Sequence, residues 1–173
     1  HLLQQVRQDS DSYAAQRVVA ISEGINESVV VIERPAGSVL LTNGHAMSAT
    51  IFPAQRYMRL FSHFPLLNTK DPSRVLVICF GVGNTLHAAS LHETVTELEV
   101  VDLSKNVLEH GHFFADTNKN ILEDERVAIF VNDGRQHLRM QDPAAYDLIT
   151  LEPPPINHAG VASLYSTEFY RLA

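Results

Sequence analysis

Apolar and polar positions between Arg17 and Thr50 follow the short period of β-strands. Three β-branched or leucine-rich runs occur in this region, namely Val18–Ile21, Ser28–Ile32 and Val39–Leu41. Arg34-Pro-Ala-Gly37 and Asn43-Gly44 carry the turn residues expected between or after such strands, since glycine and asparagine accept positive φ. The pattern predicts three or four short strands in a small antiparallel sheet.

The period changes to that of a helix after Gln55. Tyr57, Leu60, Phe61 and Phe64 stand at i, i+3, i+4 and i+7, which indicates an amphipathic helix that ends near Pro65. The polar stretch at 68–73 then predicts a linker.

Strands and helices alternate in the remainder of the chain. The strands are expected at Val75–Cys79, Glu97–Asp102, Val127–Val131 and Tyr146–Leu151, and helices are expected up to about His92, from Ser104 to about Ala115, from Asp133 to Met140 and from Thr167 onward. Continuous apolar strands alternating with helices predict an α/β fold with a doubly wound, mainly parallel sheet. The expected organisation is therefore a polar segment at 1–16, a small antiparallel β region at 17–52, a helix and linker at 53–73, and a doubly wound α/β domain at 74–173. Cys79, at the end of a buried strand, is interpreted as a core residue.

Composition narrows the function classes. The 173 residues carry a formal net charge of −7, with 13 Lys+Arg against 20 Asp+Glu, so no basic patch for nucleic acid is expected. No apolar run approaches the ~20 residues of a membrane span, so we expect no membrane contact from this segment. The single cysteine fits a reducing compartment, which predicts a cytoplasmic location. The nine histidines lack the spacing of zinc sites, and no metal is expected.

Polar or glycine-bearing residues follow each predicted parallel strand, where ligands of such sheets bind. Gly81-Val-Gly83-Asn84 follows the first strand, and Asp102 stands about twenty residues later at the end of the second. Glycines let the backbone approach a ligand, and a carboxylate at this position accepts ribose hydroxyls, so the two features describe a nucleoside site. The alternatives are that the glycines are needed only for the turn and that Asp102 caps the next helix, for which Ser104 is the better candidate.

Two further acids are expected at the same edge of the sheet. Asp133, in Asn132-Asp133-Gly134, could accept a hydrogen bond from an adenine amino group, although an Asp at this position also caps helices. Glu152 follows the fourth strand and precedes three prolines, where it could act as a general base, bind an amine, or simply face solvent.

This combination of motifs resembles the spermidine synthase (polyamine aminopropyltransferase) family. The sequence is most similar to the divergent spermidine-synthase-like branch of that family. The resemblance covers residues 23–173 and is carried by the glycine turn, Val100-Val-Asp-Leu103, Asn132-Asp-Gly-Arg135, Tyr146-Asp-Leu-Ile149 and above all Leu164-Tyr-Ser-Thr-Glu-Phe-Tyr170. The small β region matches as well, because that family has an N-terminal β-sheet ahead of its methyltransferase-like Rossmann domain. The resemblance therefore implies a Rossmann-like adenosyl-binding domain at 74–173.

The resemblance implies a role for each matching position. Gly81 and Gly83 would line the nucleoside co-substrate, Asp102 would hold its ribose, Asp133 would face its adenine, and Glu152 would take a proton from the attacking amine. The remaining expected contacts are Asn84, Leu103 and Gly134 with the co-substrate, and Tyr57 and Tyr165 with the substrate amine. Two family aspartates are replaced, by Val82 in the glycine turn and by Pro155 three residues after Glu152.

The resemblance implies transfer of an aminopropyl group from decarboxylated S-adenosylmethionine to a small-molecule amine in polyamine biosynthesis. The alternatives are an S-adenosylmethionine-dependent methyltransferase and a non-catalytic module that binds adenosyl ligands. A homodimer is implied by the resemblance only. Because the family continues with further strands, the chain is also expected to be C-terminally truncated, with an apolar edge that favours low stability or association.

Overall fold

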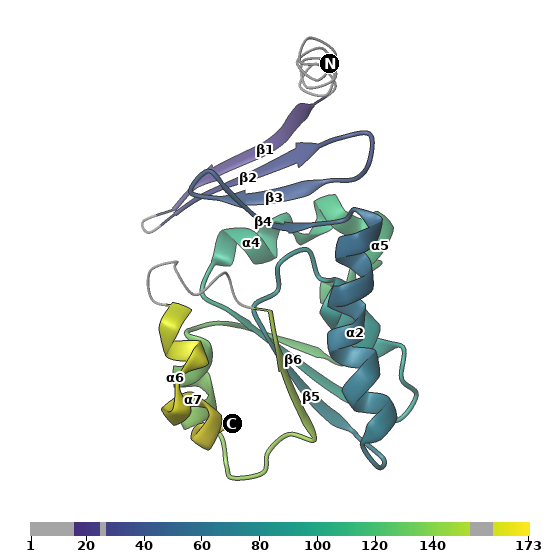
Figure 1. The fold of residues 1–173 in the computed structure, drawn as a ribbon, viewed down its shortest axis with the longest axis vertical. Helices are drawn as coiled ribbons and strands as arrows, with labels where there is room; N and C mark the ends of the chain where they lie inside the picture. Colours follow the sequence, from purple (N-terminus) through teal and green to yellow (C-terminus); the bar gives the residue numbers. More distant parts are fainter. Residues whose placement is uncertain (1–15, 25–26, 153–160) are drawn as a thin grey trace, which may run out of the picture.

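The computed structural model describes residues 16–24, 27–152 and 161–173, and these residues form two four-stranded sheets joined by helices (Figure 1). The polar N-terminal segment expected at 1–16 lies outside the described residues except for Gln16.

The N-terminal sheet is antiparallel, as the strand-period pattern predicted. Its strands are β1 (Arg17–Glu23), β2 (Ser28–Glu33), β3 (Val39–Thr42) and β4 (His45–Ala49), in the order β1-β2-β3-β4. Asn43 and Gly44 connect β3 to β4 with φ angles of 50° and 78°, the left-handed backbone that an Asn-Gly hairpin requires. The turn signal therefore marks the hairpin that leads into the fourth strand.

The second sheet is parallel and confirms the α/β, methyltransferase-like fold class. Its strands are β5 (Arg74–Ile78), β6 (Glu97–Asp102), β7 (Val127–Val131) and β8 (Leu148–Leu151), in the order β7-β6-β5-β8. The α-helices are α2 (Phe52–Asn68), α3 (Asn84–Ser90), α4 (Lys105–Glu109), α5 (Ala115–Asn118), α6 (Gly134–Arg139) and α7 (Thr167–Leu172), with 3₁₀ turns η1 (His110–Phe114), η2 (Ile121–Glu123) and η3 (Val161–Tyr165).

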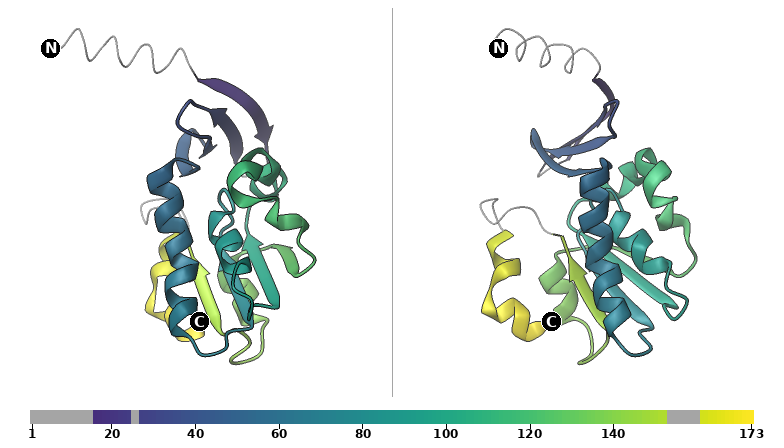
Figure 2. Two further views of the ribbon diagram at one scale, coloured as in Figure 1. Left: turned by 90° about the vertical axis from the view of Figure 1, so that its right-hand side faces the viewer. Right: turned by 45° about the vertical axis from the view of Figure 1, so that its right-hand side comes forward.

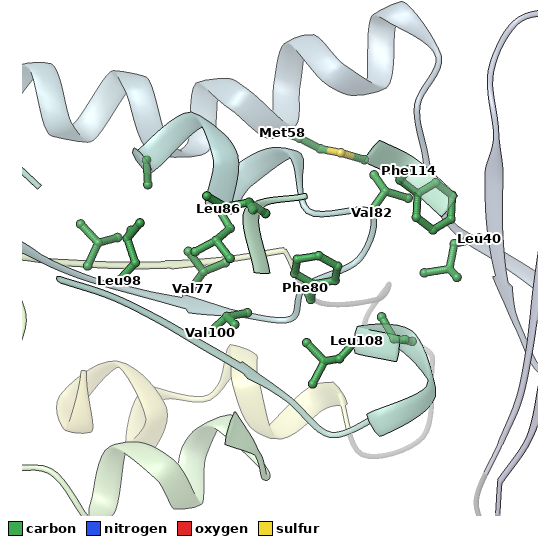
Figure 3. Packing of buried hydrophobic residues seen from close by; sticks show 14 of the residues in the cluster. Leu40, Met58, Val77, Phe80, Val82, Leu86, Leu98, Val100, Leu108 and Phe114 are labelled. Carbon is green, nitrogen blue, oxygen red and sulfur yellow. The ribbon is translucent and has the colours of Figure 1, made fainter. Parts of the chain in front are cut away.

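Helices cover both faces of the parallel sheet (Figure 2). Val75 and Val77 of β5 pack toward α2 and α3, whereas Leu76 and Ile78 pack toward α6 and α7. All four side chains are at most 1% exposed, which explains why β5 reads as an unbroken apolar run. Figure 3 shows the larger cluster, which extends from β5 and β6 to Leu40 of the N-terminal sheet and so joins the two sheets in one core.

The helix predicted after Gln55 is α2, but it continues three residues beyond Pro65, to Asn68. Proline has no N–H to donate to the carbonyl of residue i−4, which here is Phe61. The Thr150 hydroxyl of β8 donates to that carbonyl over 3.2 Å instead. A contact from a distant strand thus replaces the missing helical hydrogen bond, and the sequence around Pro65 gives no sign of it.

The buried face of α2 also differs from the expected one. The side chains that pack inward are Ala54, Met58, Ser62 and Leu66, whereas the expected apolar stripe is substantially exposed, at 45% for Tyr57, 57% for Leu60, 43% for Phe61 and 65% for Phe64. Small residues at 54 and 62 suit close packing of two helices, and the Ser62 hydroxyl donates to the Thr85 carbonyl of α3 over 2.7 Å. Within the described residues, no helix is long and apolar enough to cross a membrane.

The single helix expected from Ser104 to about Ala115 is instead three short segments, α4, η1 and α5. Ser104 caps the first of them as predicted, because its hydroxyl accepts the Val107 N–H at 3.0 Å. The interruption contains Gly111, a poor helix former whose missing side chain makes room for the Phe80 ring: a Cβ there would lie 2.9 Å from it. The regular helix is therefore interrupted at Gly111, where the backbone packs against the Phe80 ring.

Candidate functional site

A cavity of about 450 Å³ lies between the N-terminal sheet and the carboxyl ends of the parallel strands. This volume lies within the range of small-molecule sites, and the strand ends are where ligands of such sheets bind. Each parallel strand contributes to the lining: Cys79 and Gly81 follow β5, Asp102 ends β6, Asp133 follows β7 and Glu152 follows β8.

Six of the residues singled out in the sequence line this one cavity. They are Gly81, Asp102, Leu103, Asp133, Gly134 and Glu152. Their gathering follows from topology, because the carboxyl ends of parallel strands meet at the same edge of a sheet. The described lining includes four carboxylates and no lysine or arginine. The cavity is therefore suited to a ligand that carries positive charge or hydroxyl donors.

Asp102 is held in place by the backbone on both sides of it. Its Oδ2 accepts the Phe80 N–H at 2.7 Å, and its Oδ1 accepts the Ser104 N–H at 2.8 Å. Burial raises the pKa of Asp102 to about 6, although the two N–H donors act in the opposite direction. Each oxygen keeps a lone pair beyond these bonds, so Asp102 both ties the β5 turn to the β6 end and retains acceptor capacity for a ligand.

Asp133 caps a helix, which was one of the two interpretations offered for it, and its contact with adenine stays a prediction. Its Oδ1 accepts the Gln136 N–H at 2.8 Å, so it is the N-cap of α6, and it also lines the cavity. Gly134 behind it permits close packing of α6 on β5, because a Cβ there would lie 2.5 Å from the Ile78 Cγ2.

Glu152, the lining carboxylate that follows β8, accepts hydrogen bonds from two side chains. Tyr57 donates its hydroxyl to Oε1 over 2.7 Å, and the Thr85 hydroxyl lies 3.4 Å from Oε2. Burial raises the pKa of Glu152, and the hydrogen bonds from Tyr57 and Thr85 oppose part of that rise. The pKa of Tyr57 is raised as well, by burial and then by its contact with Glu152, so the phenol stays protonated and acts as the donor.

Gly83 and Asn84 lie beside the cavity lining rather than in it. Gly83 has a φ of 83°, and a Cβ there would lie 2.6 Å from the Phe80 ring, so packing alone explains this glycine. The buried Asn84 amide faces Met58, with its Nδ2 3.6 Å from Sδ. Tyr165 of η3 is 40% exposed and is not a lining residue, although Ser163 and Leu164 of the same turn are. Tyr57 also lies outside the lining, and the ligand roles of all the expected site residues, in the lining or beside it, remain predictions.

Two lining residues with titratable side chains, Glu27 and Cys79, were not predicted as site residues from the sequence. Glu27 precedes β2, and its charge raises the pKa of Asp102, so the N-terminal sheet brings a carboxylate to the Rossmann half of the cavity. Cys79, interpreted as a core residue, is only partly buried and lines the cavity. Glu27 had no local signal, because its position depends on how the sheets pack. Cys79 had one, since it follows a buried strand and precedes the glycine turn.

The structure describes one of the two positions at which a family aspartate is replaced, Val82 but not Pro155. Val82 is 1% exposed and belongs to the hydrophobic core (Figure 3), and its carbonyl accepts the Asn118 amide at 3.0 Å. It therefore adds no polar group to the cavity. Pro155 lies outside the described residues.

Comparison with known proteins gives a consistent result. Residues 54–173 match the family model described as the spermine/spermidine synthase domain. The chain is 29% identical over 153 residues to a polyamine aminopropyltransferase of Archaeoglobus fulgidus, covering 88% of this chain and 55% of the relative. It is 32% identical over 135 residues to a polyamine aminopropyltransferase of Shouchella clausii, covering 78% of this chain and 48% of the relative.

Solved structures show the same fold. A spermidine synthase crystallised with the transition-state analogue AdoDATO superposes with a TM-score of 0.82 at 22% identity, over 90% of this chain and 53% of that one. The spermidine synthase of Thermotoga maritima superposes with a TM-score of 0.78 at 23% identity, over 90% of this chain and 52% of that one. The chain thus spans about half the length of the proteins it matches.

Proposed function

The chain belongs to the spermine/spermidine synthase family, and on that premise we propose that the whole protein transfers an aminopropyl group from decarboxylated S-adenosylmethionine to a small amine. The observation that carries the proposal is the cavity in which Asp102, Asp133 and Glu152 converge from three strand ends. Polyamine biosynthesis is the corresponding process.

The charge of the cavity supports a cationic donor. Decarboxylated S-adenosylmethionine carries a sulfonium and an ammonium group, and the described lining offers Glu27, Asp102, Asp133 and Glu152 without a basic residue. A donor that keeps its carboxylate would place a like charge among these acids at a cost in binding. We assign the ribose hydroxyls to Asp102 and the adenine amino group to Asp133, both of which keep free acceptor capacity.

Glu152 is assigned the general base. Its raised pKa makes it a stronger base than an exposed glutamate, and Tyr57 and Thr85 fix its orientation. The amine nitrogen forms a bond to the carbon next to the sulfonium sulfur, the carbon–sulfur bond breaks, and its electron pair goes to sulfur as a neutral thioether leaves. Glu152 takes the proton that the nitrogen loses. Holding both substrates at the strand ends would supply a further part of the rate.

Methyl transfer from S-adenosylmethionine is the second candidate. It is favoured by Val82, whose burial in the core leaves the donor's aminoalkyl end without the carboxylate that the family places there. The acid-only lining argues against it, since no described cation faces the cavity to pair with the carboxylate of that donor. A non-catalytic adenosyl-binding module is the third candidate.

Calorimetric titration with methylthioadenosine, S-adenosylmethionine and its decarboxylated form separates the three. We expect the decarboxylated donor to bind more tightly than the carboxylated one, and the reverse preference would support methyl transfer. Failure of all three to bind would contradict the nucleoside site itself.

The role of Glu152 is tested by amine-dependent formation of methylthioadenosine. Glu152→Gln should lower the rate by about 10²–10⁴-fold while leaving methylthioadenosine binding intact. Glu93→Gln, an exposed glutamate outside the cavity lining, is the matched control. Donor binding without turnover in the unaltered protein would support the non-catalytic alternative.

A further inference from the structure

Cys79 has a backbone conformation that normally selects glycine. It stands directly after β5 with a φ of 72°, and its N–H donates to the Val101 carbonyl over 2.9 Å. In this left-handed region a Cβ crowds the following carbonyl oxygen, so L-residues other than glycine, asparagine and aspartate are uncommon there. The chain therefore keeps a side chain where glycine would be free of strain.

The side chain stands where the strand ends meet. Cys79 lines the cavity, and it also packs against the cluster that contains Ile78 and Val101. Burial raises the pKa of the thiol, and the charges of Asp102, Glu152 and Asp133 raise it further. The thiol is thus neutral at physiological pH and lies near the three carboxylates to which we assign the ribose, the amine and the adenine.

We propose that Cys79 is a specificity-determining residue, whose neutral thiol forms part of the cavity floor and limits the size of the group carried on the sulfur of the nucleoside ligand. This inference rests on the proposed function, since the ligand is taken to be a 5′-thio- or sulfonium-substituted adenosine. The part of the ligand that links the ribose to the transferred group would lie on the cavity floor between Asp102 and Glu152. The volume of the Cys79 side chain at this place excludes a bulky substituent on the ligand sulfur and does not affect how the adenine binds.

Three substitutions isolate the effect of side-chain size. Cys79→Gly removes the side chain, Cys79→Ala removes only the sulfur, and Cys79→Ser replaces the thiol by a hydroxyl of similar size. We expect Cys79→Gly to raise the melting temperature by a few degrees, because the left-handed backbone is relieved. Cys79→Ser should keep the unaltered melting temperature within about 2 °C.

The decisive measurement is the ratio of calorimetric dissociation constants for 5′-methylthioadenosine and 5′-butylthioadenosine. Cys79→Gly should shift this ratio toward the butyl compound by about tenfold, as expected when space for a few methylene groups is opened. Cys79→Ala should give a smaller shift in the same direction, and Cys79→Ser should leave the ratio unchanged.

The chain's single cysteine provides an independent readout. Saturating methylthioadenosine should shift the carbon-13 resonance of the Cys79 Cβ in the unaltered protein labelled at cysteine. If methylthioadenosine binds but neither the ratio in Cys79→Gly nor the Cys79 resonance changes, the inference about Cys79 is wrong and the nucleoside site stands. If methylthioadenosine does not bind the unaltered protein, the proposed function and this inference both fail.

Discussion

Tyr57 donates its hydroxyl to the Oε1 of Glu152 over 2.7 Å, which joins the helix before the Rossmann sheet to the end of its fourth strand. The two residues are 95 positions apart in the chain. This contact opposes the effect of burial on Glu152, because a donor stabilises the carboxylate. Tyr57 thereby sets how readily Glu152 ionises.

Tyr57→Phe should raise the pKa of Glu152 further, because the carboxylate loses the hydrogen bond that favours its charged form. Carbon-13 NMR titration of the Glu152 carboxyl measures the change directly. The acid limb of the rate profile for aminopropyl transfer should move to higher pH by the same amount. Tyr170→Phe, at an exposed tyrosine outside the cavity lining, is the control. An unchanged Glu152 titration in Tyr57→Phe would show that the hydrogen bond has no influence on the base.

Stability should fall as the pH rises through the Asp102 titration. The pKa of Asp102 is raised from 3.8 to about 6, so the folded protein keeps a proton that the unfolded chain releases near pH 4. The stabilising contribution is complete below about pH 4 and is lost as the pH rises through 6, on the order of 3 kcal/mol in total. Urea denaturation of the unaltered protein between pH 4 and 7 should show this fall. Asp102→Asn should make the fall smaller, and the part that remains comes from Glu152, whose pKa is also raised by burial.

Asp147 is a control for the same experiment, because its pKa is lowered in the folded protein whereas that of Asp102 is raised. Its carboxylate accepts the N–H groups of Ser73 and Arg74 at 2.8 and 2.9 Å, and these bonds hold its pKa below the ordinary value. Its contribution is present above the unfolded pKa and is lost as the pH falls through the folded one. Asp147→Asn should therefore change the acid side of the stability curve and leave the interval from pH 4 to 7 as it is. A fall in that interval that is equally large in Asp102→Asn would contradict the assignment to Asp102.

The strands and the meeting of the acids could be predicted because each depends on local pattern plus topology. β5 is apolar on both faces, and Asp102, Asp133 and Glu152 follow strands whose carboxyl ends must share one edge. Glu27 could not be predicted in the same way, since it reaches the cavity only through packing of the N-terminal sheet on the Rossmann half.

The face that α2 buries could not be predicted for a related reason. Hydrophobic periodicity identifies a helix, but burial here goes to Ala54 and Ser62, which permit a close approach to α3. The large apolar residues were assigned to the core because size and hydrophobicity are the only local guides. Whether a neighbouring element exists to cover them is information that the helix itself does not contain.

The end of α2 gives a third prediction. The Thr150 hydroxyl donates to the Phe61 carbonyl, to which Pro65 cannot donate because it has no N–H. Thr150→Val should therefore lower the free energy of unfolding by about 1 kcal/mol. In a Pro65→Ala background the new alanine has an N–H that can bond that carbonyl, so Thr150→Val should cost less. The double-mutant cycle from urea denaturation should give a coupling energy of about 0.5–1 kcal/mol. If the effects of the two substitutions on the free energy of unfolding were strictly additive, the two residues would not be donors to the same carbonyl.

The exposed stripe of α2 predicts self-association of this chain. Five large side chains that are 43–76% exposed (Tyr57, Leu60, Phe61, Phe64 and Leu67) present roughly 500 Å² of apolar surface. The stripe carries no charge and lies beside β8, an edge strand of the described sheet. Two copies that cover it mutually would bury roughly 1,000 Å², the lower limit of a specific interface.

Sedimentation velocity at roughly 10–100 μM should therefore show a concentration-dependent dimer or larger species. Leu60→Lys should shift the chain toward monomer, because an ammonium group in a buried interface costs several kcal/mol. Leu91→Lys is a matched control, since Leu91 is 59% exposed against 57% for Leu60 and lies at the end of α3, outside the stripe. A monodisperse, cooperatively melting monomer of the unaltered chain would contradict the prediction, and an equal effect of both lysines would mean that association does not use the α2 stripe.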